Sequence, residues 1–180
     1  MNFVSNFVWI DLEMTGLNPD HDVILEIACI ITDDRLTVIK ESPLFVIYQP
    51  EEKLDQMNEW SQKQHTLSGL VQEVRNSTIS INQAEKQILN FLQSHCKPGT
   101  ALLAGNSVWQ DRIFMRRYMP SIVDFLYYRL IDVTTIKELV NRWYPNNEKV
   151  EFLKKDTHRA LEDIYESIAE LKHYKKYFFV

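Results

Sequence analysis

The chain has 180 residues, of which 45% are hydrophobic and 25% are charged, which is an ordinary composition for a globular protein. The net charge of −5 argues against tight, non-specific binding to long nucleic acids, because proteins of that class usually present a strongly basic surface. No run approaches the roughly 20 apolar residues of a membrane span, and the first residues do not form a signal peptide. We therefore expect one cytoplasmic domain over residues 1–180, with Cys29 and Cys96 as reduced thiols.

The first predicted strand begins at Phe7, and its apolar residues Val8, Ile10 and Leu12 fall on one face at a period of two. Trp9, Asp11 and Glu13 project from the other face. Two carboxylates held this close raise each other's pKa unless a cation lies between them, and a metal ion is the natural cation. The alternative is an edge strand with a solvated acidic face. A turn follows at Gly16, where the backbone can approach a ligand closely.

Two more strands are predicted at residues 24–31 and 43–48, the second of them stopped by Pro50. Three consecutive strands with short turns indicate an antiparallel meander. Residues 55–60 are predicted to form a short helix or turn, and residues 65–70 a polar loop.

Helices and strands alternate in the second half of the chain. A capping box at Ser80 and Gln83 opens a helix that ends before residues 98–99, and residues 101–104 fit a buried parallel strand. A helix at 111–119, a strand at 128–133, a helix opened by a second capping box at Thr135 and Glu138, and a last helix at 157–177 follow. The core stripe of that last helix is predicted to be Leu161, Ile164, Ile168, Leu171 and Phe178. This pattern predicts an α/β fold with a mixed sheet flanked by helices.

Asp111 closes the loop that follows the predicted strand at 101–104, and ligands of α/β sheets gather beyond the carboxyl ends of parallel strands. The alternative role for Asp111 is a helix N-cap. Asp163 lies off the core stripe of the last helix, beside the small residues Ala160 and Ser167, and His158 stands near the start of that helix. The alternative for His158 and Asp163 is a solvated surface pair.

Three segments carry a resemblance to a known superfamily: DLEMTGL at 11–17, GNSVWQD at 105–111 and THRALED at 157–163. They resemble the three motifs of the DEDD superfamily of 3′-to-5′ exonucleases. The resemblance implies a ribonuclease-H-like fold and assigns the four acidic positions and the general base of the H-type branch to Asp11, Glu13, Asp111, Asp163 and His158. It also implies two divalent cations, Mg²⁺ or Mn²⁺, held by the four carboxylates.

A closer resemblance covers nearly the whole chain and includes NEW…HTLSGLV, YRLIDVTTIKEL and THRALEDIYESIAEL. These segments are similar to the oligoribonuclease family, whose members degrade very short RNA to mononucleotides. Two departures are small, since Thr134 stands where a serine is usual and Glu162 where an aspartate is more frequent. The resemblance implies a homodimer that acts on short RNA oligonucleotides. It implies no membrane partner.

The same resemblance implies the substrate contacts. Leu17 would wedge near the bases, and Met14, Trp60, His65 and Ser107 would contact the nucleotide. Tyr128, Arg129 and Thr134, partly from the partner subunit, would cap the terminal 5′ phosphate. The alternatives are a core-packing Leu17 and a solvated Arg129. Two rival functions remain open, namely a proofreading-type exonuclease for single-stranded DNA and a non-catalytic nucleotide-binding protein.

Overall fold

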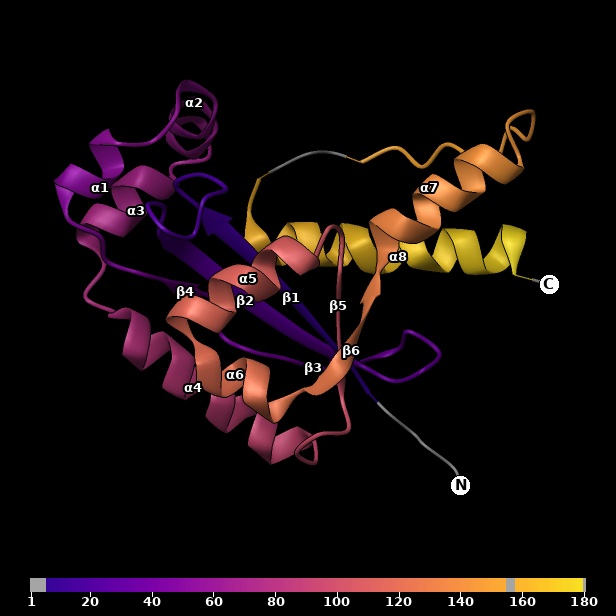
Figure 1. Cartoon of the computed structure of the whole chain (residues 1–180), viewed down its shortest axis with the longest axis horizontal. Helices are drawn as coiled ribbons and strands as arrows, with labels where there is room; N and C mark the ends of the chain where they lie inside the picture. Colours follow the sequence, from indigo (N-terminus) through magenta and orange to yellow (C-terminus); the bar gives the residue numbers. More distant parts are fainter. Residues whose placement is uncertain (1–5, 155–157, 180) are drawn as a thin grey trace.

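A computed structural model describes residues 6–154 and 158–179, and all strands within these ranges join one sheet. Its order is β3-β2-β1-β5-β6, with β4 also paired to β2 (Figure 1). β1 is antiparallel to β2 and parallel to β5, and β6 is parallel to β5, so the predicted mixed sheet is confirmed. The strands are β1 (Phe7–Met14), β2 (Ile24–Thr32), β3 (Val38–Glu41), β4 (Phe45–Val46), β5 (Leu102–Gly105) and β6 (Tyr127–Asp132).

Helices cover both faces of the sheet (Figure 1). One face packs against α4 (Ile81–His95), α5 (Trp109–Tyr118) and α6 (Pro120–Phe125), and the other against α7 (Val133–Trp143) and α8 (Ala160–Phe178). Three short helices come before α4. α1 (Glu51–Asp55) and α3 (Leu70–Asn76) pack beside β2 and β4, and α2 (Glu59–Leu67) packs against α3.

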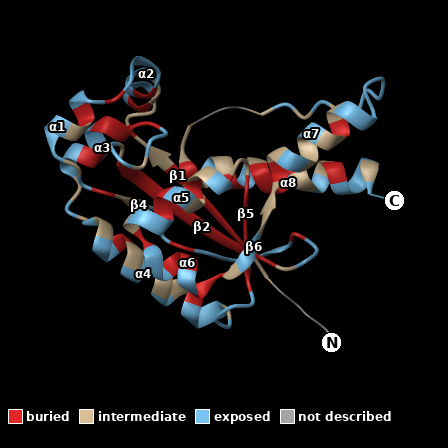
Figure 2. Ribbon diagram, in the orientation of Figure 1, coloured by how far each residue is buried: buried red, intermediate tan, exposed pale blue. Residues whose placement is uncertain are grey.

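The central strands β1 and β2 are the most buried part of the fold (Figure 2). As predicted, Val8, Ile10 and Leu12 lie in the core shared with α4 to α6. Trp9 lies in the other core, shared with α7 and α8. Since side chains alternate along a strand, Asp11 and Glu13 project toward the α8 face beyond Trp9.

Two strand predictions need correction. Only residues 45–46 of the predicted strand at 43–48 pair with β2, and β3 at 38–41 pairs with β2 as well, where no strand was predicted. The side chains of β3 are all exposed, so this edge strand lacks the buried alternation on which a sequence prediction depends.

The loop predicted at residues 65–70 is wrong as well. Residues 59–67 form α2, whose N-cap Asn58 accepts a hydrogen bond from the backbone N–H of Ser61. The buried residues of this helix are Ser61 and His65, both polar, so the helix has no apolar stripe that sequence periodicity would detect.

Helix starts were predicted with mixed success. The capping box at Ser80 and Gln83 is confirmed. The second capping box is wrong, because α7 begins at Val133 and its cap is Asp132, which accepts from the backbone N–H of Thr134. The helix predicted at 111–119 is confirmed as α5, which ends at Tyr118. Pro120 then opens α6, a position where its missing N–H costs nothing.

The last helix also differs from its prediction. It begins at Ala160, and Thr157, its predicted start, lies outside the described residues. Its core stripe extends to Tyr174, which is fully buried, whereas Leu161, Leu171 and Phe178 are only partly buried.

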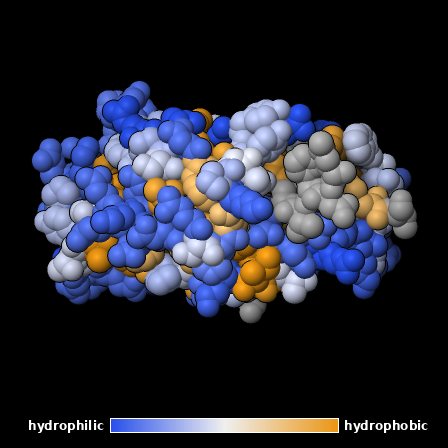
Figure 3. All heavy atoms as spheres, turned by 90° about the horizontal axis from the view of Figure 1, so that it is seen from below, coloured by the Kyte–Doolittle hydropathy of each residue, from blue (hydrophilic) through white to orange (hydrophobic). Residues whose placement is uncertain are grey.

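Within the described ranges, no helix is long and apolar enough to cross a membrane. The face of the molecule drawn in Figure 3 is mostly hydrophilic, with apolar side chains scattered in small patches.

Candidate active site

Three carboxylates from two elements converge at one end of the sheet. Asp11 and Glu13 project from β1, and Asp163 lies in the first turn of α8, which packs across β1 and β2. Each of the three residues offers a carboxylate oxygen, and these oxygens all lie within 4.8 Å of one another. The period-two spacing in the strand and the position of the helix start together build this cluster.

Asp111 reaches the same end of the sheet from α5. It is the third residue of that helix, whose N-cap is Val108, so the capping alternative is wrong. Its Oδ1 accepts a hydrogen bond of 3.0 Å from the backbone N–H of Leu12. The β1–β5 ladder extends only to Trp9, so Leu12 lies beyond it and its N–H is available to the carboxylate.

Gly105 allows α5 to approach β1 this closely. A Cβ atom on Gly105 would lie 3.2 Å from the carbonyl oxygen of Ile10 and 3.1 Å from Cγ2 of Val108. Both contacts are tight, so the glycine holds the turn between β5 and α5 close to the strand that carries Asp11.

The carboxyl groups of the cluster are buried and close together, and both conditions raise their pKa values. Burial, reinforced by the charges of Asp111, Glu13 and Asp163, raises the pKa of Asp11 well above its usual value. Burial and the charge of Asp163 raise the pKa of Glu13 to about 8, although Arg159 acts in the opposite direction. Burial also raises the pKa of Asp111 to about 8 against the lowering effect of its hydrogen bonds. At neutral pH such a cluster favours either protons or a cation.

A divalent cation fits this donor set. The three converging donors are all carboxylate oxygens, which hard cations such as Mg²⁺ and Mn²⁺ prefer. A bound cation would also offset the like-charge repulsion that raises the pKa values of Asp11 and Glu13. Asp11, Glu13 and Asp163 could hold the ion. Asp111 is not among the three carboxylates that converge within 4.8 Å, although its charge acts on Asp11.

His158 stands directly before the start of α8. Its backbone φ is +53°, in the left-handed region that non-glycine residues rarely adopt. Its ring meets that of Trp60 edge-to-face, with centroids 5.3 Å apart. Trp60 projects from α2, so this contact joins a helix far away in the sequence to the candidate general base.

His65 is buried in the last turn of α2, and its Nε2 lies 2.9 Å from the carbonyl oxygen of Met14. A carbonyl only accepts hydrogen bonds, so Nε2 carries the proton and Nδ1 is the acceptor of the neutral ring. Among the described residues Nδ1 has no hydrogen-bond partner, and it lies 3.8 Å from Oε2 of Glu13. Burial lowers the pKa of His65, which favours this neutral form.

Ser107, on the loop between β5 and α5, meets Thr134 in the first turn of α7. The backbone N–H of Ser107 donates to Oγ1 of Thr134 and to Oδ1 of Asp132, and the two hydroxyls lie 3.1 Å apart. Ser107 also has a positive φ of +48°. Among the described residues only Leu36 shares this left-handed conformation with Ser107 and His158, apart from glycines. Strained backbone of this kind concentrates at functional sites.

The other predicted substrate contacts are spread over the surface. Leu17 is 71% exposed, so the core-packing alternative is wrong, and its carbonyl accepts a hydrogen bond from Gln110. Tyr128 and Arg129 are also exposed, with Nε of Arg129 donating to the hydroxyl of Tyr128. The side chain of Met14 packs against the core shared with α4 to α6, so Met14 meets the site through its carbonyl.

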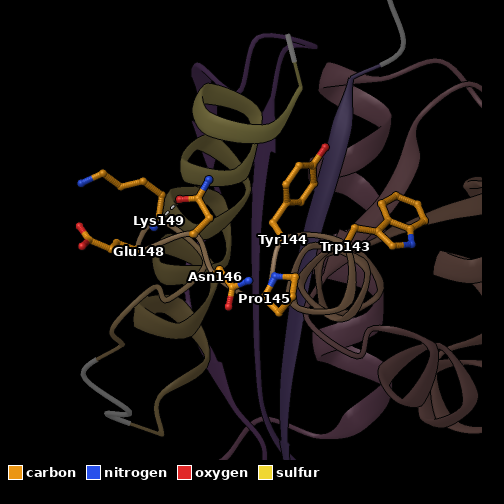
Figure 4. A pocket seen from close by; sticks show the side chains of 7 residues that line it. Trp143, Tyr144, Pro145, Asn146, Glu148 and Lys149 are labelled. Atoms are coloured by element: carbon orange, nitrogen blue, oxygen red, sulfur yellow. Dashed lines mark hydrogen bonds between the residues drawn. The ribbon is translucent and has the colours of Figure 1, made fainter.

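None of the predicted site residues lines the hollow of about 630 Å³ at the end of α7 (Figure 4). It is lined by the consecutive residues 143–149, with Trp143 and Tyr144 at one side and Lys149 at the other.

Two buried acidic residues near the site were not predicted from the sequence. Glu26 and Glu170 are fully buried charges, on β2 and α8 respectively. Glu170 accepts hydrogen bonds from Asn106 and Tyr174 and pairs with Lys154. The signal for both was a charge inside an otherwise apolar run or stripe, where charges occur almost only when they are paired.

Comparison with known proteins identifies the family. The family model described as Exonuclease (RNase_T) matches residues 8–171. Over 180 residues the chain is 50% identical to the oligoribonuclease of Dichelobacter nodosus and covers 98% of that protein. The chain belongs to the oligoribonuclease family of exonucleases. It is also 50% identical to the oligoribonuclease of Pseudomonas aeruginosa, covering 97% of this chain and 96% of that one. The human mitochondrial oligoribonuclease is 46% identical over 99% of this chain and 75% of its own length.

Solved structures support the fold. Exonuclease I from Methylocaldum szegediense superposes with a TM-score of 0.74 at 15% identity, over 97% of this chain and 41% of that one. An E. coli exonuclease I in complex with an oligonucleotide gives a TM-score of 0.69 at 18% identity, over 95% of this chain and 41% of that one. This oligoribonuclease family member therefore spans less than half of those exonucleases and shares with them the ribonuclease-H-like exonuclease fold.

Proposed function

We propose that this chain hydrolyses short RNA oligonucleotides, dinucleotides above all, from the 3′ end to mononucleotides. It would act as one exonuclease domain that uses two divalent cations, Mg²⁺ or Mn²⁺. The observation that carries the proposal is the convergence of Asp11, Glu13 and Asp163 within 4.8 Å, in a chain half identical to oligoribonucleases.

The four carboxylates Asp11, Glu13, Asp111 and Asp163 would hold the cations. Bound divalent ions turn water into a stronger nucleophile at neutral pH and neutralise charge on the attacked phosphate. His158 would take the proton from the attacking water through the unprotonated nitrogen of its ring. The edge-to-face contact with Trp60 supports this role, because it restricts the orientation of the imidazole.

The substrate contacts would use both apolar and polar groups. The exposed side chain of Leu17 would stack on the bases, and Met14 would contact the nucleotide. His65 would contact the nucleotide, and its Nδ1 has no hydrogen-bond partner within the described part of the chain. Ser107 would contact the nucleotide through its hydroxyl, and Trp60 would border the scissile end.

The 5′ end of the substrate would be held by Tyr128, Arg129 and Thr134, partly from the partner subunit of a homodimer. Tyr128 and Arg129 are exposed side by side, and a guanidinium forks well around a phosphate. Such a cap would fit short substrates only. The free cysteines Cys29 and Cys96 support a reducing compartment, and we assign the protein to the cytoplasm.

The test is hydrolysis of labelled RNA of graded length, from dinucleotides upward, with Mg²⁺, Mn²⁺ or EDTA. We expect mononucleotide products from the shortest substrates, no product in EDTA, and no product from Asp11→Ala. The matched control is Asp124→Ala, which removes an exposed carboxylate of α6 and should leave activity unchanged. An active Asp11→Ala variant would refute the metal-dependent mechanism. Processive degradation of long single-stranded DNA would instead favour the proofreading type.

A further inference from the structure

Glu26 places a further carboxylate directly beside the cluster of Asp11, Glu13 and Asp163. It lies in the continuous buried run of β2, its side chain is 0% exposed, and it faces Glu13 in the β1–β2 register. Side chains directly opposite in an antiparallel pair project from the same face, so both carboxylates point toward α8. A buried charge in such a place is costly unless it is paired and hydrogen-bonded. The fold therefore needs a dedicated partner for Glu26.

Arg159 is that partner. Its Nε and Nη2 donate to both carboxylate oxygens of Glu26 at 2.8 to 3.3 Å. The backbone N–H of Ala160 adds a hydrogen bond of 2.9 Å to Oε1 of Glu26. On its outer side, the guanidinium donates to Glu73 of α3, whose side chain is 45% exposed. One arginine thus joins α8 to β2 and to α3.

These contacts replace an ordinary helix cap. Arg159 occupies the N-cap position of α8, and its side chain caps no backbone N–H. The carboxylate of Glu26 instead accepts the N–H of Ala160, the first residue of the helix, from a neighbouring strand. A negative charge at this end of a helix is also favoured by the helix dipole.

Arg159 lies in the chain between the candidate general base and a candidate metal ligand. Arg159 directly follows His158, whose φ is +53°. Its carbonyl oxygen accepts the backbone N–H of Asp163 at 3.0 Å, in the first turn of α8. The residue fixed to β2 therefore lies between the candidate base and the metal ligand, and is bonded to each of them through the backbone.

We propose that Glu26 and Arg159 form an anchor that fixes the start of α8 on β2 and so positions His158 and Asp163 against Asp11 and Glu13. Both are positioning residues, because they act through His158 and Asp163. This inference rests on the proposed function, in which His158 takes a proton and Asp163 holds a cation. Displacements of about 1 Å in such a site cost around 100-fold in rate.

Three variants separate positioning from plain stability. Arg159→Met leaves the charge of Glu26 buried and unpaired, and should lower both the melting temperature and kcat. Glu26→Gln/Arg159→Met removes both charges, and its glutamine still accepts the N–H of Ala160. The melting temperature should therefore recover, while kcat stays about 10- to 100-fold below wild type because the fork is gone. KM for a dinucleotide should change less than kcat, since the substrate contacts are retained.

Glu73→Gln is the matched control, because it also changes to an amide a carboxylate that accepts from the guanidinium of Arg159. It removes only the charge of the solvent-exposed ion pair with Arg159, and exposed ion pairs contribute little to stability. Its kcat should stay close to wild type. Amide hydrogen exchange at Ala160 and Asp163 should be faster in the double variant and unchanged in Glu73→Gln.

Mn²⁺ affinity, measured by electron paramagnetic resonance, reports on Asp163 without any RNA. We expect it to fall in the double variant, by about the same 10-fold or more as kcat. Recovery of kcat and Mn²⁺ affinity together with the melting temperature would overturn the anchor and leave a stabilising ion pair. Failure of the wild type to cleave RNA would refute the proposed function instead, and the Mn²⁺ and exchange measurements would still decide on the anchor.

Discussion

The metal-free protein should lose stability as the pH rises from 6 to about 8. Glu13 titrates with a pKa of about 8 in the folded chain, because it is buried beside Asp163. In the unfolded chain a glutamate titrates near about 4.3. Across this window the folded state keeps a proton that the unfolded state has released, so the free energy of unfolding decreases as the pH rises. A divalent cation replaces the proton and should reverse the trend.

The expected effect is large enough to measure. Glu13 is only 12% exposed, so solvent screens its charge weakly. Each pH unit between 6 and the folded pKa costs about 1.4 kcal/mol, or about 3 kcal/mol over two units. For a chain of this size, this loss lowers the melting temperature by roughly 5–10 °C. Asp111, whose pKa is also about 8, acts in the same direction. The two effects should not simply add, because the sites are close together.

The assay is thermal unfolding in EDTA at pH 6, 7, 8 and 9, repeated with saturating Mg²⁺. An ion at 100 times its Kd raises the free energy of unfolding by about 2.7 kcal/mol, and this gain should grow with pH. Glu13→Gln is the control, because it removes the titrating group but retains the shape of the side chain. A melting temperature in EDTA with the same pH slope in wild type and Glu13→Gln would refute the reasoning.

Three further predictions concern the base, the cap and the turn. His158→Ala should lower kcat by about 10²–10⁴-fold and leave Mn²⁺ affinity unchanged, whereas a collapse of affinity would make His158 a ligand. Arg129→Ala should weaken hydrolysis of a 5′-phosphorylated dinucleotide by roughly 10- to 150-fold, and of an unphosphorylated one far less. Mixing the Arg129→Ala protein with the His158→Ala protein should restore activity only if the partner subunit supplies the residues that cap the 5′ phosphate. Gly105→Ala should cost about 1–3 kcal/mol in urea unfolding, since its Cβ would crowd Ile10 and Val108; an unchanged midpoint would show that the turn relaxes.

The sequence predicts best what depends on local periodicity. Asp11 and Glu13 share a face because side chains alternate along a strand, and the structure brings them to Asp163. The turn at Gly16 was also predicted, but what approaches it closely is the carboxylate of Asp22, 2.5 Å from where a Cβ would lie. Periodicity locates a feature in the chain, whereas its partner depends on the whole fold.

The rest of the site depends on contacts between distant segments. Asp111 was predicted to belong to the site, with a helix cap as the alternative, but its actual partner was not predicted: its carboxylate accepts the N–H of Leu12, 99 residues away in the chain. His65 lies on a helix whose buried side is polar, so no apolar stripe revealed it. Local patterns carry no information on such pairings, because the two partners are brought together only by the folded sheet.

The strained backbone of Ser107 and His158 is held in place by residues outside the three motifs that carry the chemistry. Ser107 is held in its left-handed conformation by Asp132, the last residue of β6, and by Thr134, in the first turn of α7. His158 is followed directly by Arg159, which is fixed by Glu26 of β2. Strained residues persist only where their surroundings determine them from several sides. Transferring the three motifs to another sheet would therefore transfer the carboxylates but not their geometry, unless the buried charge on β2 and the capping aspartate of α7 were transferred as well.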